Sequence, residues 1–114
     1  LDADQLAYLI AVNNELGTIV PADVGARVSP GRLHIDATQA LGKVRLERWS
    51  FQFASGSAHK FYGPKGVGFL YAENPHELIP QTIGGGQESG LRSGTLNVPG
   101  IVGMGAAAEF ALQD

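Results

Sequence analysis

An amine, an imidazole and a hydroxyl lie close together in the run Ser-Ala-His-Lys-Phe-Tyr-Gly-Pro-Lys-Gly at residues 57–66. A lysine amine condenses with an aldehyde, small polar groups bind a phosphate, and glycines permit sharp turns. The run therefore predicts a covalent site for a cofactor of the pyridoxal phosphate kind. The prediction rests on this run taken together with Asn13-Asn14-Glu15, Asp36-Ala37-Thr38-Gln39 and Arg92-Ser93-Gly94-Thr95.

Lys60 is the candidate nucleophile of this run. Its neighbours Phe53, Phe61 and Tyr62 are apolar, and an amine held among them is desolvated, which favours the neutral form that attacks an aldehyde. The alternative is a surface lysine on a loop, the commonest place for this residue type. Lys65 is the competing amine, but the proline and glycines beside it predict a turn that holds it in solvent.

Asp36 is the candidate acid. It comes just after a short apolar run, and its carboxylate there can pair with the protonated ring nitrogen of pyridoxal phosphate. That charge keeps the ring able to accept electrons from a substrate α-carbon. The alternative is that Asp36 caps a helix beginning near Thr38, with its oxygens accepting hydrogen bonds from backbone N–H groups.

Composition excludes several other classes of protein and site. The chain has 114 residues, 44% of them hydrophobic, no cysteine and a net charge of −3, which is typical of one ordinary globular domain and not of a nucleic-acid-binding one. No apolar run reaches the roughly 18 residues of a membrane span, and no secretion signal is visible. The three histidines lack metal-ligand spacing, and neither a nucleotide-binding glycine motif nor a hydrolase serine motif is present. The absence of cysteine is compatible with a reducing compartment, and we expect the protein to lie in the cytoplasm.

Apolar runs alternate with short crossovers, which predicts an α/β fold. The expected strands are 6–12, 33–36, 50–55 and 66–72, with a short extended segment over 79–83 at an edge of the sheet or outside it. The expected helices are a short one over 21–28 closed by Pro30-Gly31, one beginning at Thr38 and interrupted at Gly42, and one from Val98. The first strand is expected to be buried, and the first two are expected to pair in parallel. The last helix is expected to present a small-residue face at Ile101, Gly105, Ala108 and Leu112.

Two loops are candidate ligand-binding segments. The loop 13–17 follows the first strand, at the carboxyl end where open α/β sheets bind ligands, although its two asparagines are also common turn formers. The segment 84–95 carries five glycines and has no helical or strand period. A long loop of this kind is usually functional.

Taken together, these residues make the chain resemble a cysteine desulfurase of the class V aminotransferase family, and the resemblance runs from about Ile10 to Leu112. The likeness rests on the stretches Val-Asn-Asn-Glu-Leu-Gly (12–17), His-Ile-Asp-Ala-Thr-Gln (34–39), the run 57–66, Gly-Gly-Gly-Gln-Glu-Ser-Gly-Leu-Arg-Ser-Gly-Thr (84–95) and Ile-Val-Gly-Met-Gly (101–105). It implies a fold type I architecture with a mostly parallel sheet and flanking helices. Residues 1–114 would be the central part of the cofactor-binding large domain, incomplete at both ends.

The resemblance also implies a role for each matching residue. Lys60 would form the internal aldimine, with His59 as its catalytic companion, and Asp36 would pair with the ring nitrogen. Gln39 would donate to the phenolic oxygen of the ring, near Asn14 and the substrate carboxylate. The phosphate would be held by the side chains of Ser57 and His59 and by the backbone of Ala58, with Thr95 reaching the phosphate of the partner subunit in a homodimer.

The reaction implied by the resemblance takes sulfur from L-cysteine and leaves L-alanine and a persulfide, which a sulfur-acceptor protein takes on for iron–sulfur cluster or thiolation pathways. The family's persulfide-carrying cysteine is expected beyond residue 114, and its ring-stacking histidine is expected before Leu1. We therefore expect this chain to be a piece that does not turn over substrate alone. The alternatives are a selenocysteine lyase, an aminotransferase, and a non-catalytic remnant that folds or dimerises without cofactor.

Overall fold

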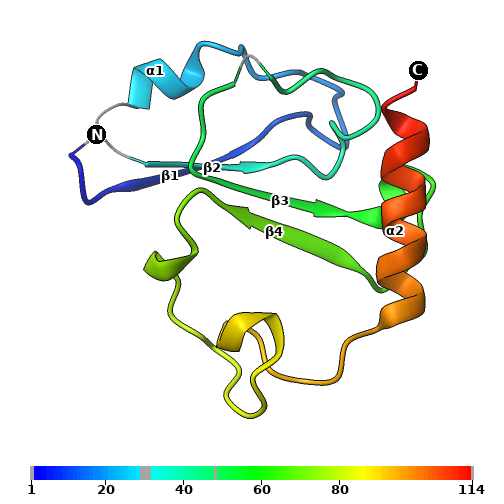
Figure 1. Ribbon diagram of the computed structural model, residues 1–114. Coiled ribbons are helices and arrows are strands. Elements are labelled where there is room, and N and C mark those ends of the chain that lie inside the picture. Colours follow the sequence, from blue (N-terminus) through cyan, green and yellow to red (C-terminus); the bar gives the residue numbers. More distant parts are fainter. Residues whose placement is uncertain (1, 29–31, 48, 114) are drawn as a thin grey trace.

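Four strands form one sheet in the order β1-β2-β3-β4 in the computed structural model, which describes residues 2–28, 32–47 and 49–113 (Figure 1). The strands are β1 (Leu6–Ile10), β2 (Arg32–Asp36), β3 (Phe53–Ser57) and β4 (Gly68–Ala72). Helix α1 (Val24–Val28) lies in the first crossover, and helix α2 (Val98–Ala111) ends the chain. Three short 3-10 helices are η1 (Ala58–Lys60), η2 (Pro75–Glu77) and η3 (Gln87–Gly90).

The sheet is mostly parallel, as predicted. Strand β2 pairs in parallel with both β1 and β3, whereas β4 is antiparallel to β3. Parallel neighbours need a crossover between them, and all of their carboxyl ends then meet at one edge of the sheet. In Figure 1 the arrowheads of β2 and β3 point toward α2, and that of β4 points away from it. The fold is α/β, with the loops after β1, β2 and β3 gathered at one edge.

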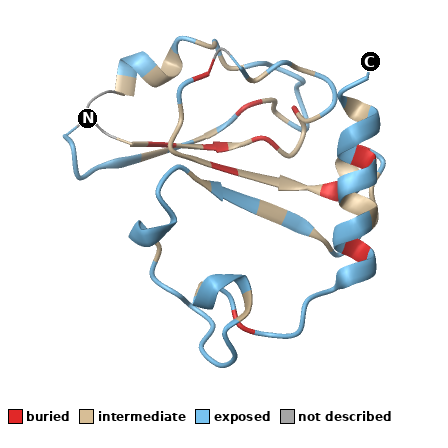
Figure 2. Ribbon diagram, in the orientation of Figure 1, coloured by how far each residue is buried: buried red, intermediate tan, exposed pale blue. Residues whose placement is uncertain are grey.

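The two faces of the sheet are very unequal. On one face Leu33 and Ile35 are fully buried, and a cluster of apolar residues from the crossovers packs over them (Figure 2). We call this the closed face. On the other, the open face, the large apolar side chains of Leu6, Tyr8 and Leu70 are each more than half exposed. Because side chains alternate along a strand, neighbouring residues of β2 point to opposite faces of the sheet.

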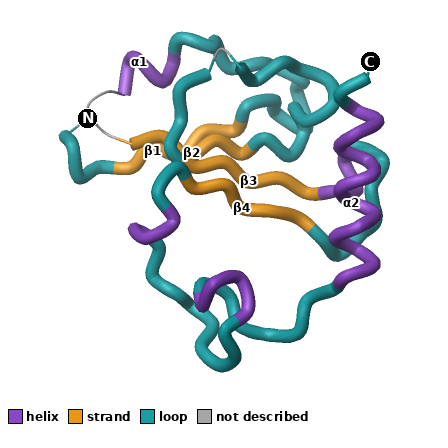
Figure 3. The backbone as a smooth tube through the Cα atoms, viewed as in Figure 1, coloured by secondary structure: helices purple, strands orange, loops and turns teal. Residues whose placement is uncertain are grey.

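Three expectations about strands and helices need correction. The first strand ends at Ile10, not Val12, and is half exposed instead of buried, because its open face has no cover in the described residues. The strand expected over 50–55 occupies Phe53–Ser57. The helix expected from Thr38 is absent from the described chain there: residues 38–43 form successive turns in which Gly42 takes a left-handed φ of 69° (Figure 3). The expected closing turn at Pro30-Gly31 lies outside the described residues.

Helix α2 is present where it was predicted, but it packs through a different face. Its cap is Asn97, whose side-chain oxygen accepts the backbone N–H of Gly100 at 3.1 Å. The buried residues are Gly100 and Ala107, and Ala107 packs with Ala58 and Phe61. The expected face of Ile101, Gly105, Ala108 and Leu112 is exposed. The helix is apolar on all sides, so its helical period alone does not select the face that packs.

Candidate active site

The predicted site residues gather at the carboxyl ends of the three parallel strands. Asn14 follows β1, Asp36 ends β2, and the Ser57–Lys60 segment ends β3 and forms η1. The register places Asp36 beside Ser55, and the backbone N–H of Ala37 continues the ladder by donating to the Ser55 carbonyl oxygen at 2.9 Å. Adjacent parallel strands thus bring the acid and the lysine segment to the same edge of the sheet.

Both carboxylate oxygens of Asp36 accept a hydrogen bond. Its Oδ1 accepts the backbone N–H of Thr38 at 2.9 Å, and its Oδ2 accepts the hydroxyl of Tyr8 at 3.1 Å. The capping alternative is therefore correct for one oxygen, although a turn and not a helix follows. Each carboxylate oxygen accepts two hydrogen bonds, so the side chain retains acceptor capacity for a ligand.

The surroundings of Asp36 favour its ionised form. Partial burial raises the pKa of Asp36, but the hydrogen bonds from Thr38 and Tyr8 and the charge of His34 outweigh it, and the net pKa lies below the ordinary value. Asp36 is accordingly a carboxylate at neutral pH. A fixed negative charge at the end of a strand is what a protonated pyridine nitrogen requires.

Two aromatic side chains line the open face next to Asp36. The rings of Tyr8 and His34 have centroids 4.8 Å apart, and His34 Nε2 lies 3.0 Å from Ser55 Oγ. Burial lowers the pKa of His34, against the opposing charge of Asp36, which favours the neutral imidazole. Burial, together with the hydrogen bond to Asp36 and its charge, raises the pKa of Tyr8 and keeps its hydroxyl protonated.

In the segment after β3, two polar side chains are hydrogen-bonded to each other, and one backbone N–H already has a hydrogen-bond acceptor within the chain. Ser57 Oγ and His59 Nδ1 are hydrogen-bonded at 2.8 Å, and the ring of His59 is exposed. The backbone N–H of Ala58 donates to the Val67 carbonyl oxygen at 3.1 Å. An anion at this segment therefore meets the Ser57 and His59 side chains, whereas it would have to share the Ala58 N–H with the β3–β4 connection.

Lys60 ends the η1 turn and is half-buried. Its carbonyl oxygen accepts the amine of Lys43 at 2.9 Å, which ties the turn to the loop after β2. Only part of the expected apolar surroundings is present: Phe61 is buried against α2, but Tyr62 is 98% exposed and has a left-handed φ of 67°. Tyr62 therefore does not shield the amine in the described structure.

The two asparagines of the loop after β1 do different things. Asn13 forms the turn, because its Oδ1 accepts the backbone N–H groups of Glu15 and Leu16, both at 2.9 Å. Asn14 is exposed at the strand end. Gln39 is half-buried in the turn that follows Asp36. The turn-forming alternative thus holds for the first asparagine and leaves the second available to a ligand.

Thr95 lies apart from these residues along the chain, exposed in the loop that joins η3 to α2. Figure 1 shows this loop beyond β4, the antiparallel strand at the end of the sheet. Ser93 ties this loop to the segment before η3, because its Oγ donates to the Gly85 carbonyl oxygen at 2.6 Å. Glu88 and Ser89 adopt left-handed φ values of 51° and 56° within the preceding η3. Such non-glycine outliers often mark functional loops.

Comparison with known sequences and structures identifies the family. A sequence model of the family described as Aminotransferase class-V matches residues 2–114. The chain belongs to the class V aminotransferase family. "Cysteine desulfurase IscS" of Anaeromyxobacter dehalogenans is 50% identical over 113 residues, and "Cysteine desulfurase, mitochondrial" of Arabidopsis thaliana is 44% identical over 116. The alignments cover 93% and 96% of this chain but only 28% and 26% of those relatives, so the chain spans about a quarter of their length.

Solved structures agree with this family assignment. The structure titled "NIFS-LIKE PROTEIN" is 44% identical with a TM-score of 0.85, and the match covers 96% of this chain and 32% of that one. DndA from Streptomyces lividans is 40% identical with a TM-score of 0.87, over 99% and 35% of the two chains. "SspA in complex with cysteine" is 44% identical with a TM-score of 0.82, over 91% and 32%. The class V fold therefore extends over nearly all of this chain.

The donor set of the class V site fits pyridoxal phosphate. Asp36 supplies an ionised carboxylate with free acceptor capacity, and Ser57 and His59 supply polar side chains at the next strand end. Lys60 supplies a primary amine on the same segment. Among the described residues no group of three or more acidic or histidine side chains could hold a metal ion, and no helix has the length and apolar character to cross a membrane.

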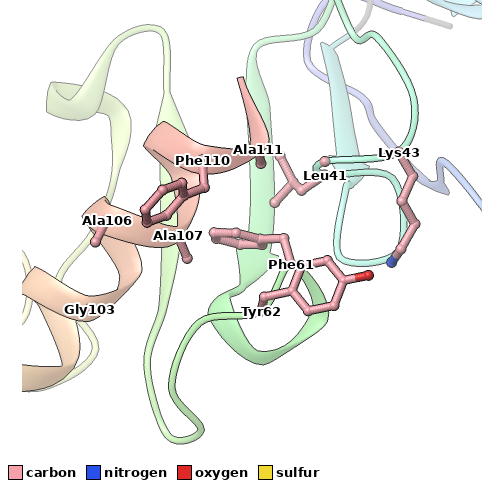
Figure 4. Close-up of a pocket in the computed structure, with 10 residues that line it drawn as sticks. Leu41, Lys43, Phe61, Tyr62, Gly103, Ala106, Ala107, Phe110 and Ala111 are labelled. Carbon is pink, nitrogen blue, oxygen red and sulfur yellow. The ribbon is translucent and has the colours of Figure 1, made fainter. Parts of the chain in front are cut away.

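An apolar cavity of about 440 Å³ lies between the segment after η1, the loop after β2, and α2 (Figure 4). Leu41, Phe61, Ala107 and Phe110 are among its lining residues, and Lys43 contributes the one charged side chain among them. The cavity holds none of the predicted cofactor-binding residues. Its lining lacks the several polar groups that a phosphate and a charged ring require.

The sequence alone does not identify Tyr8, His34 and Ser55 as site residues. Tyr8 lies within an apolar run, and His34 has no metal-ligand spacing to the other histidines. The signal that finds them is the alternation of side chains combined with the parallel register, which places all three on the face of Asp36. That register depends on pairing between distant segments, and a single sequence does not reveal it.

Proposed function

We propose that this chain is the central part of the pyridoxal-phosphate-binding large domain of a cysteine desulfurase. Its class V membership and its 44–50% identity to relatives named as cysteine desulfurases support the proposal. The observation that carries it is the gathering of Asn14, Asp36 and the Ser57–Lys60 segment at adjacent strand ends. In open α/β sheets ligands bind at this edge.

When bound, the cofactor supplies an electron sink that allows bonds at the α-carbon of an amino acid to break. Asp36 stabilises the proton on the ring nitrogen through its carboxylate. Gln39 would donate its amide N–H to the phenolic oxygen of the ring, and the exposed Asn14 would lie near that oxygen and the substrate carboxylate. These three residues would orient the ring: Asp36 ends β2, and Asn14 and Gln39 lie in the loops that follow β1 and β2.

The catalytic pair in this proposal is Lys60 and His59. Lys60 would hold the cofactor through its Nζ, and its amine would accept and return protons at the substrate α-carbon. His59 shares a hydrogen bond with Ser57 Oγ, so its ring nitrogen can hold a proton while both side chains contact the phosphate. The backbone N–H of Ala58 would also contact the phosphate if it divided its hydrogen bond between the phosphate and the Val67 carbonyl oxygen.

The whole reaction converts L-cysteine to L-alanine and leaves the sulfur as a persulfide for a sulfur-acceptor protein. A relative's structure is titled as a complex with cysteine, which favours this substrate. The described chain contains no cysteine, so the persulfide must form on a group outside these 114 residues. We propose a homodimer in which Thr95 reaches the phosphate of the partner subunit, and a cytoplasmic location, although some relatives are named as mitochondrial.

Two observations favour a non-catalytic role for the isolated chain. The chain spans only about a quarter of the length of its relatives and leaves one face of the sheet open. We therefore expect these 114 residues to bind the cofactor without turning over cysteine. Alanine formation from cysteine would show that the chain is a complete catalyst. Transamination, or elimination of selenium from selenocysteine in preference to sulfur, would favour the other class V activities.

The direct test is the absorbance of added pyridoxal phosphate. We expect the chain to give the band near the edge of the visible range that is typical of the lysine-bound cofactor. Lys60→Ala should abolish this band, and Lys65→Ala should keep it, because Lys65 is exposed in the turn after η1. A band that survives Lys60→Ala would refute the assignment of the reactive lysine.

A further inference from the structure

The hydroxyl of Tyr8 lies at hydrogen-bond distance from the acid of the proposed site, and the function above assigns it no role. Tyr8 is on β1, directly opposite His34, and Ile10 is opposite Asp36. Tyr8 and Asp36 are therefore diagonal neighbours on the open face, a separation that a long aromatic side chain spans. The hydroxyl reaches Asp36 Oδ2 at 3.1 Å.

We propose that Tyr8 is a positioning residue for Asp36, holding the carboxylate in the single orientation in which it meets the cofactor ring. The proposal rests on the proposed function for the identity of that ring. It concerns the hydrogen bond between two residues of this chain, which exists without the cofactor.

The geometry fixes the carboxylate at both of its oxygens. The backbone N–H of Thr38 holds Oδ1 at 2.9 Å, and the Tyr8 hydroxyl holds Oδ2. Rotation about the Cβ–Cγ bond has to break at least one of these hydrogen bonds. Each oxygen keeps a further acceptor site, so a protonated ring nitrogen can bind without displacing Tyr8.

The Tyr8 ring is itself held by its neighbours. It packs on His34 with a tilt of 58°, and His34 packs in turn on Phe53 with centroids 6.4 Å apart. His34 is anchored by its 3.0 Å contact with Ser55 Oγ. A chain of contacts across β1, β2 and β3 thus sets the position of the hydroxyl, although the Tyr8 side chain is partly exposed.

The electrostatics agree with this arrangement. The titratable groups that act on Asp36 are Tyr8 from β1 and His34 from β2, and the uncharged Thr38 and Ser55 complete its surroundings. A donor to the ionised form lowers the pKa of a carboxyl, so removal of the hydroxyl should raise the pKa of Asp36. His34 remains in place in such a variant.

Tyr8→Phe removes only the hydroxyl, and Tyr71→Phe is the matched control. Tyr71 lies on β4 and packs edge-on against Phe51, away from Asp36. The carboxyl ¹³C shift of Asp36, followed by NMR from pH 2 to 7 in the 114-residue chain without cofactor, reports its pKa. We expect Tyr8→Phe to raise the pKa of Asp36 and Tyr71→Phe to leave it unchanged. Pyridoxal phosphate should then bind Tyr8→Phe about 2- to 10-fold more weakly at pH 7, the range of one hydrogen bond.

The outcomes separate the two proposals. An unchanged pKa of Asp36 in Tyr8→Phe overturns the role of Tyr8, whatever the cofactor does. A large fall in the urea midpoint of Tyr8→Phe relative to Tyr71→Phe also overturns it, because Tyr8 would then be a structural residue. A raised pKa of Asp36 in a chain whose Lys60 never gives the cofactor band supports the role of Tyr8 and rejects the proposed function.

Discussion

The closed and open faces of the sheet are built from alternate residues of the same strands, yet they differ in nearly every physical property. Leu33 and Ile35 of β2 point into the closed face and are no more than 1% exposed. His34 and Asp36, the residues between and after them, point to the open face and take part in a polar network with Tyr8 and Ser55. One strand therefore serves packing and chemistry at the same time.

The difference teaches how the site is held in place. The closed face fixes the strands by burial, so the open face and the strand ends can carry polar groups that contribute little to packing. The open face also exposes Leu6, Ile10 and Leu70, a set of large apolar side chains typical of a surface that another segment or molecule covers. Stability should then depend mainly on the closed face, and ligand binding on the open face and its edge.

The largest expected effect is on the closed face. Leu33→Ala should lower the free energy of unfolding by about 2–5 kcal/mol, because it removes a fully buried side chain and leaves a cavity. Leu6→Ala on the open face, where the side chain is 56% exposed, should cost less than about 1 kcal/mol. Urea unfolding of both variants measures the contrast. Equal losses would show that the open face is packed in solution.

Substitutions of two glycines, one closely packed and one with open space around it, extend the comparison between buried and exposed regions. At Gly56 of β3 an added Cβ would lie 2.5 Å from Leu41 Cδ1 and 2.7 Å from Phe69 Cε1, so Gly56→Ala should destabilise by about 1–3 kcal/mol through overpacking. At Gly105 of α2 nothing lies within 4 Å of the added Cβ. Gly105→Ala should therefore stabilise the helix by about 0.5–1 kcal/mol. Thermal unfolding of the two variants gives the sign, and a stabilising Gly56→Ala would contradict the packing described.

A smaller effect is expected from the charge on the open face. The pKa of Asp36 lies below its ordinary value of 3.8, so its ionised form contributes stability that is complete above that value. This contribution disappears as the pH falls through the pKa of the folded state. Below the range in which the coupled His34 titrates, the stability difference between the wild type and Asp36→Asn should change as the pH falls from about 5 toward 3. Urea midpoints across this range test it, and a difference that stays constant down to pH 3 would show that Asp36 is unperturbed.

The closed face and the site edge were largely predictable from the sequence. Apolar runs that stop at a polar residue predicted β2 and its end at Asp36, and short crossovers predicted parallel pairing. The helix from Thr38 was wrong, because the left-handed Gly42 and the turns around it override the local helical signal. The packing face of α2 was also wrong, since its sequence is apolar on every side.

The open-face network could not be predicted, because it depends on register. Tyr8 meets Asp36 only when β1 pairs with β2 so that Tyr8 lies opposite His34, and a shift of one residue would turn Tyr8 to the closed face. Whether the lysine segment and the acid share an edge depends likewise on the order of the strands. The motif residues were visible in the sequence, whereas the partners that set their charge and orientation were not.

The central claim is that Lys60 is the residue that bonds the cofactor at the edge shared with Asp36. Borohydride reduction of the chain with pyridoxal phosphate makes such a bond permanent, and peptide mass spectrometry then locates it among the chain's three lysines, 43, 60 and 65. We predict the added mass on Lys60, with loss of the modification when Asp36→Ala weakens binding. Modification of Lys43, whose amine lies 2.9 Å from the Lys60 carbonyl oxygen, or an even spread over all three, would contradict the account.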